Sequence, residues 1–140
     1  MRRSFLLISF AAMWLSTAAS AFAQNAPFPS KEGEKAKYSV MIEFPKAYIS
    51  GIGVIAFQEG RVVGTVFNEF GVSAISFTYD EAKNKVKLLS MIGKLNRWYV
   101  KRVVKNDLKH VLHVLKKSGT TYINEKQHII YNWHPLAIQE

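Results

Sequence analysis

Cysteine is absent from this chain of 140 residues, and acidic residues are few. Without cysteine the protein has no disulfide, no thiolate metal ligand and no thiol to which a lipid anchor can be attached. We therefore expect its stability to come from apolar packing, from a partner or from a bound ligand. Asp and Glu number 10 against 19 Lys and Arg, so the chain is basic, with a formal net charge of +9.

The first 23 residues have the pattern of a secretory signal peptide. Arg2 and Arg3 precede an apolar run from Phe5 to Leu15, and the sequence Ala-Phe-Ala ending at Ala23 supplies the small residues that a signal peptidase recognises. The apolar run is shorter than the ~20 residues that a membrane-spanning helix needs. We predict cleavage after Ala23 and a mature protein that is periplasmic or secreted.

The predicted mature chain keeps most of the positive charge. Removal of Arg2 and Arg3 leaves 17 basic residues against 10 acidic ones, a formal charge of +7. A basic protein in the cell envelope meets anionic lipid headgroups and acidic polymers more readily than nucleic acid. We therefore expect no nucleic-acid partner, and an anionic membrane surface as a partner.

Residues 24–37 are polar and show no periodicity, so we expect a flexible lead-in to a single domain over residues 38–140. Apolar residues alternate with others from Tyr38 to Phe44, which predicts a strand. Two further strands, Ile49–Gln58 and Arg61–Phe67, flank Glu59-Gly60 and predict a hairpin. A two-residue turn would oppose residues 53 and 66, 55 and 64, and 57 and 62.

The second half of the chain predicts two more strands, a helical segment and a final hairpin. The strands are Val72–Tyr79 and Lys85–Ile92, and the hairpin joins residues 120–124 to 128–133. Between them, Lys94–Lys117 has helical periodicity, but its apolar face turns by roughly 130° after Asn106. We expect two short helices, with Asn106 or Asp107 capping the second.

Glycine occupies three strand positions, Gly51, Gly53 and Gly64, that the predicted hairpin places on one face. Glycine inside a strand marks strong bending or the close approach of another group to the backbone. Curvature of a partly closed barrel explains the cluster, and so does room for the chain of a ligand.

Neither a catalytic nor a metal site is predicted. His110 and His113 lie three residues apart, but a third ligand would have to come from His128 or His134, and neither a cysteine nor an H-E-x-x-H pattern supports a metal. The serines lack a nucleophile elbow, and no glycine-rich phosphate loop occurs. We expect a protein that is not an enzyme and that carries no cofactor.

The order of these segments resembles a known group of proteins. Asn68-Glu69-Phe70-Gly71 follows a hairpin, and Asn106-Asp107-Leu108 lies in the helical segment, as in small uncharacterised bacterial envelope proteins that look like relatives of the LolA/LolB-like lipoprotein-localisation factors. The resemblance covers about residues 38–115. It implies an incomplete antiparallel barrel with helices on an apolar concave side that takes an apolar ligand. The chain is shorter than a full barrel of that kind, and it lacks the cysteine of the lipoprotein receptor.

Pattern and resemblance together predict an α+β fold, an antiparallel meander that forms a half β-barrel with two short helices on its concave face. We expect a non-enzymatic binding protein for a lipid or the acyl chain of a lipoprotein, with a homodimer completing the barrel. The alternative is an interaction module that docks through its sheet edge or basic helix face. Strand parity and aromatic position select the candidate ligand-binding residues Ile55, Phe57, Val62, Val66, Phe77 and Trp98.

Four basic residues of the helical segment, Lys94, Arg97, Lys101 and Lys105, line the side opposite its apolar face. Such a stripe is often only the solvated face of an amphipathic helix. Trp98 and Tyr99 lie beside it, and aromatic rings next to basic residues suit a membrane interface. These four residues are therefore candidates for contact with an anionic surface.

Overall fold

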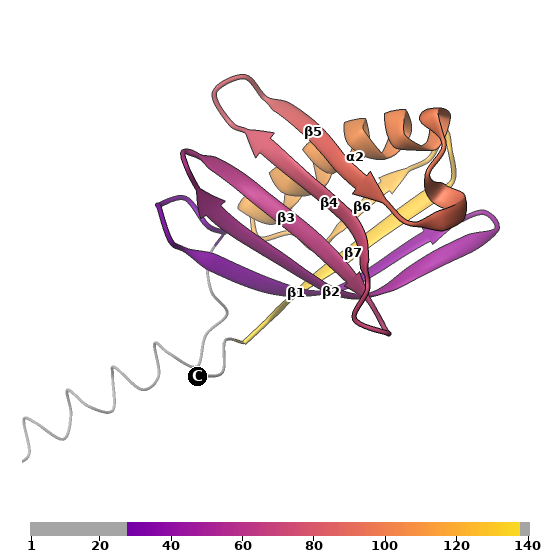
Figure 1. The fold of residues 1–140 in the computed structure, drawn as a ribbon, viewed down its shortest axis with the longest axis horizontal. Helices are drawn as coiled ribbons and strands as arrows, with labels where there is room; N and C mark the ends of the chain where they lie inside the picture. The colour runs from indigo at the N-terminus through magenta and orange to yellow at the C-terminus, as the bar shows by residue number, and fades with distance from the viewer. Residues whose placement is uncertain (1–27, 138–140) are drawn as a thin grey trace, which may run out of the picture.

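The structure, a computed structural model that describes residues 28–137, contains one antiparallel sheet of seven strands in the order β5-β4-β3-β2-β1-β7-β6 (Figure 1). The expected half-barrel is confirmed. Five strands follow one another as a meander, and the chain then crosses through a helix to the other edge. The strands are β1 (Lys35–Phe44), β2 (Ala47–Gln58), β3 (Arg61–Asn68), β4 (Ser73–Asp80), β5 (Lys85–Met91), β6 (Thr121–Asn124) and β7 (Ile129–Leu136).

The β2–β3 hairpin has the register that the sequence predicts. Gly53 lies opposite Val66, and Ile55 lies opposite Gly64. The two turn residues, Glu59 and Gly60, both have positive φ, at 54° and 76°. A two-residue turn with this backbone matches the right-handed twist of the flanking strands, which is why it sets the register.

The start of the domain is tied to the same hairpin. β1 begins at Lys35, three residues before the expected start at Tyr38. The Glu32 carboxylate accepts hydrogen bonds from the backbone N–H groups of Glu59 and Gly60, at 2.6 and 3.4 Å. The predicted signal peptide and its cleavage site lie outside the described residues.

A single long helix, α2 (Trp98–Lys116), packs on the concave side of the sheet after a short 3₁₀ turn, η1 (Gly93–Leu95). The expectation of two short helices is wrong. α2 buries one stripe, made of Val104, Asp107, Leu108, Val111, Leu112 and Leu115. Tyr99 is exposed and Val100 and Val103 are only half-buried, so the apolar residues before Asn106 do not form a second buried face.

Asp107 belongs to the buried stripe because the sheet supplies its hydrogen-bond partners. The residue is 1% exposed and lies in the middle of α2, not at a cap. The Tyr131 hydroxyl donates to its Oδ2 at 2.7 Å, and the Asn124 amide donates to both carboxyl oxygens at 3.0 Å. Asp107 accepts all three bonds, as an ionised carboxylate does. It therefore joins α2 to β6 and β7.

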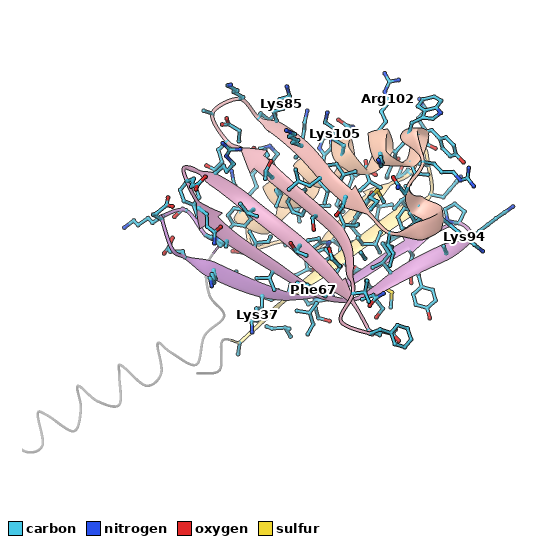
Figure 2. The ribbon with its side chains drawn as sticks, viewed as in Figure 1. Lys37, Phe67, Lys85, Lys94, Arg102 and Lys105 are labelled. Carbon is cyan, nitrogen blue, oxygen red and sulfur yellow. The ribbon has the colours of Figure 1, made fainter. Side chains whose placement is uncertain are left out.

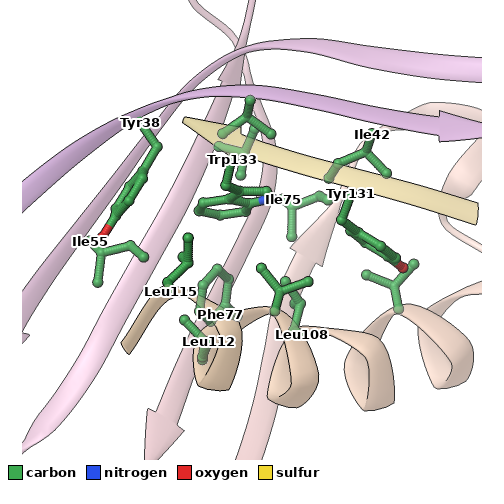
Figure 3. Packing of buried hydrophobic residues seen from close by; sticks show 14 of the residues in the cluster. Tyr38, Ile42, Ile55, Ile75, Phe77, Leu108, Leu112, Leu115, Tyr131 and Trp133 are labelled. Carbon is green, nitrogen blue, oxygen red and sulfur yellow. The ribbon is translucent and has the colours of Figure 1, made fainter. Parts of the chain in front are cut away.

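The core fills the space between the sheet and α2. Leu108, Leu112 and Leu115 point from the helix toward Phe77 and Trp133 of the sheet (Figure 3). Gly53 of β2 and Gly64 of β3 make room for these rings. A Cβ atom on Gly53 would lie 2.8 Å from Val40 Cγ2 and 2.9 Å from Trp133 Cζ3, and one on Gly64 would overlap the Phe77 ring. The space above these glycines is thus taken by core aromatics.

Candidate functional site

Four of the six predicted ligand-binding residues lie in the core. Ile55, Val62, Val66 and Phe77 are fully buried in the cluster that includes the apolar stripe of α2. Strand parity therefore identified the inward face correctly, but the helix covers that face. A ligand could reach these side chains only by displacing α2 from the sheet.

The other two predicted residues lie away from that cluster's centre. Phe57 is half-buried near the β2–β3 turn, where its backbone N–H donates to the carbonyl of Glu34. Trp98 is the first residue of α2 and is 74% exposed. Its ring meets that of Tyr99 edge to face, with centroids 5.8 Å apart. The six residues do not form one cavity.

An apolar hollow of about 360 Å³ lies where the start of one strand meets two connections of the fold. The start of β2, the β3–β4 turn and the β5–α2 connection supply its walls. We call it the end hollow. Its lining residues are Tyr48, Ile49, Ser50, Asn68, Glu69, Phe70, Ala74, Ile92, Gly93, Lys94 and Leu95.

The β3–β4 turn is shaped by the Asn68 side chain. Asn68 Oδ1 accepts hydrogen bonds from the backbone N–H groups of Phe70 and Val72, at 2.9 and 3.0 Å. Gly71 adopts a positive φ of 76°, a backbone conformation that residues other than glycine rarely adopt. This turn leaves the Phe70 side chain 87% exposed at the hollow, and Tyr48 beside the hollow is 65% exposed. The Asn-Glu-Phe-Gly sequence thus encodes a turn that presents an aromatic ring to solvent.

The β5–α2 connection forms the opposite wall. The Ile92 N–H donates to the carbonyl of Ala74 at 2.9 Å, which extends the pairing of β4 and β5 past Met91. Gly93 then turns the chain with a φ of 51°. The 3₁₀ turn that follows brings half-buried Leu95 and exposed Lys94 to the hollow.

The predicted basic stripe is divided in the folded protein. Lys94 lines the end hollow, whereas Lys105 lines a second groove beside α2, which Arg102 also lines. Figure 2 shows Lys94 well apart from Arg102 and Lys105. Arg97 and Lys101 are exposed and line neither site. The four residues therefore do not act on one ligand of small size.

The two helix histidines contact different neighbours. The His110 ring stacks on Tyr122 with centroids 5.0 Å apart, and His113 Nε2 lies 3.2 Å from Asn84 Oδ1. Within residues 28–137, no group of three or more His, Cys, Asp and Glu is placed to hold a metal ion. No helix in this part of the chain is long and apolar enough to cross a membrane.

Sequence reasoning missed the aromatic residues of the end hollow, Tyr48 and Phe70. The sequence held a signal for Phe70. It lies in a turn that begins with Asn68 and ends with Gly71, and a large apolar side chain in such a surface turn cannot pack into the core.

Comparison with known proteins adds nothing to this site: no family model, no curated protein and no solved structure matches the chain.

Proposed function

We propose that this protein is a non-enzymatic binding protein of the cell envelope, and that the end hollow takes the apolar part of a lipid or of an acylated lipoprotein. The observation that supports this most directly is an apolar hollow with two exposed aromatic rings at its edge. Exposed rings that adjoin a hollow are typical of ligand or interaction sites, whereas scattered exposed apolar residues are common on any protein. The hollow's volume lies in the usual range for small-molecule sites.

Burial would supply the binding energy. Each methylene group of an acyl chain removed from water contributes about 0.8 kcal/mol, and Ile49, Ile92 and Leu95 offer apolar surface for such contacts. Lys94 at the same hollow attracts an anionic headgroup. Glu69 also lines the hollow and opposes that attraction, so the headgroup would lie on the Lys94 side.

The cellular setting of this proposal comes from the sequence. Residues 1–23 predict export, and the resemblance to lipoprotein-localisation factors favours an acyl-bearing ligand. We assign that ligand to the end hollow and not to a cavity under the sheet, because α2 and its side chains occupy the concave face. α2 also packs against both edge strands, β5 and β6, and a homodimer that completes the half-barrel would form across these edges.

Ligand binding can be tested on the mature chain, residues 24–140. Native mass spectrometry after mild extraction should detect about one copurifying lipid per chain. A fluorescent dansyl fatty acid should bind with a saturable signal that decanoate displaces. A double variant, Tyr48→Ser with Phe70→Ser, should weaken this binding, because both side chains adjoin the hollow and are exposed enough to be replaced without loss of folding.

A matched control variant is Val72→Ser with Ile123→Ser. Both side chains are large, apolar and exposed, and neither lines the end hollow. Equal loss of dansyl fatty acid binding in the two double variants would mean that the dye reports general surface hydrophobicity.

Recovery of the bare polypeptide, with no binding of the fatty acid, would favour the alternative of an envelope interaction module that docks through its sheet edge or basic helix face.

A further inference from the structure

A groove of about 530 Å³ runs between α2 and the β6–β7 turn, on a part of the molecule that the end hollow does not share. We call it the basic groove. Four cationic side chains line it: Arg102, Lys105 and Lys109 from the helix, and Lys126 from the turn. The helical three lie at intervals of three and four residues, which places them along one face of α2.

Within the part of the chain that the structure describes, no acidic side chain forms an ion pair with the cations of the basic groove. Among residues 28–137, the single ion pair joins Lys116 to Glu81, away from this groove. The one acid that lines the groove is Asp107, whose oxygens already accept bonds from Asn124 and Tyr131. Glu125 is exposed on the same turn but does not line the groove. Clustered like charges in a hollow attract an ion of opposite charge strongly.

The walls of the groove are held in place by one side chain. Asn124 donates to Asp107 of the helix, and its Oδ1 accepts a hydrogen bond from the Gln127 N–H in the turn at 3.1 Å. The turn that carries Lys126 is therefore fixed relative to the helix that carries the other cations. Tyr122, stacked on His110, and Val103 add apolar surface to the same groove.

We propose that the basic groove binds a phosphate group carried on an organic molecule. Arg102 can bind phosphate oxygens through two parallel hydrogen bonds, and lysine ammonium groups add point charges. The amide side chains of Asn106 and Gln127, which also line the groove, add donors. The apolar wall formed by Tyr122 and Val103 suits the organic part of the molecule. A lipid headgroup and a soluble organophosphate share this chemistry.

Isothermal titration of the mature chain with two probes separates these sources. The probes are glycerol 3-phosphate and monomeric dihexanoyl phosphatidic acid, which carries the same phosphate with two short chains. The groove variant is Arg102→Gln with Lys105→Gln. The control variant is Arg97→Gln with Lys101→Gln, which removes one Arg and one Lys from exposed positions of the same segment that line neither site.

We expect the groove variant to weaken binding of at least one probe by about tenfold or more, because each lost bond to a charged group is a strong one. The control variant should bind both probes as the wild type does. The Tyr48→Ser, Phe70→Ser variant should bind glycerol 3-phosphate as the wild type does, because this probe has no acyl chain for the end hollow. Equal affinity for both probes would indicate a soluble ligand, and preference for the lipid would indicate a headgroup. Absence of binding by the wild type, or equal loss in the groove and control variants, would overturn the proposal.

Discussion

The hydrogen bond from Tyr131 to Asp107 should be among the strongest single polar contacts in this protein. The Tyr131→Phe change removes only the hydroxyl that donates to Asp107 Oδ2 at 2.7 Å. Both residues are almost completely buried, so water cannot replace the lost donor. Asn124 remains as a partner, and the ring of the new Phe fills the same space.

The expected loss follows from the charge of the acceptor. A hydrogen bond to a charged group contributes about 1.5–3 kcal/mol, and a buried carboxylate left short of donors is costly in itself. We therefore expect Tyr131→Phe to lower the free energy of unfolding by about 2 kcal/mol. Tyr122→Phe is the control, because Tyr122 is a half-buried neighbour with no hydrogen bond from its hydroxyl group to the described residues.

Urea unfolding at pH 7, followed by circular dichroism, measures both variants. The control should stay within about 0.5 kcal/mol of the wild type. A Tyr131→Phe variant as stable as the control would show that Asp107 does not depend on this donor.

Asn106→Ala tests the continuity of the helix. The Asn106 side chain is exposed in the middle of α2, so alanine should leave the free energy of unfolding unchanged or raise it by up to about 0.5 kcal/mol. A clear loss would instead indicate a helix cap and a break at this position.

Two other predictions concern the core and alkaline pH. Gly53→Ala should lower the free energy of unfolding by about 1–3 kcal/mol, because its Cβ would crowd Val40 and Trp133; an unchanged urea midpoint would contradict the packing. Burial raises the pKa of Tyr38 to about 12, so the folded protein holds this proton more tightly than the unfolded chain does. The contribution of Tyr38 to the free energy of unfolding should therefore be fully present below pH 10 and be lost as the pH rises toward 12. Urea titrations at pH 9 and 11 should show a smaller fall in the free energy of unfolding for Tyr38→Phe than for the wild type.

The strands and hairpins could be predicted because their signals are local. Alternation of apolar and polar residues, and the Glu59-Gly60 turn, are visible in a few consecutive residues, and the predicted pairing of Gly53 with Val66 is the observed one. The break in the helix was wrong for the opposite reason. Asp107 is buried because Asn124 and Tyr131 meet it from 17 and 24 residues away, and no local pattern contains that information.

The candidate site could be predicted from the sequence only in part, for a related physical reason. Strand parity shows which side chains face inward, and Ile55 and Phe77 do so. Parity does not show whether a helix fills the space that they face, because that depends on how its volume packs against the sheet. The charged residues of the basic groove likewise come together through the helix and a later turn. Lys126 is 21 positions after Lys105 in the chain, yet both line that groove.

The central claim, that an apolar ligand occupies the end hollow and not the core, is tested most directly by NMR of the ¹⁵N-labelled mature chain during titration with decanoate. We predict saturable shifts of the backbone amides of Ser50, Phe70 and Leu95, which line the hollow, with little change at Ile55 and Phe77 in the core. Shifts centred on Ile55 and Phe77, or no saturable shift at all, would contradict the account.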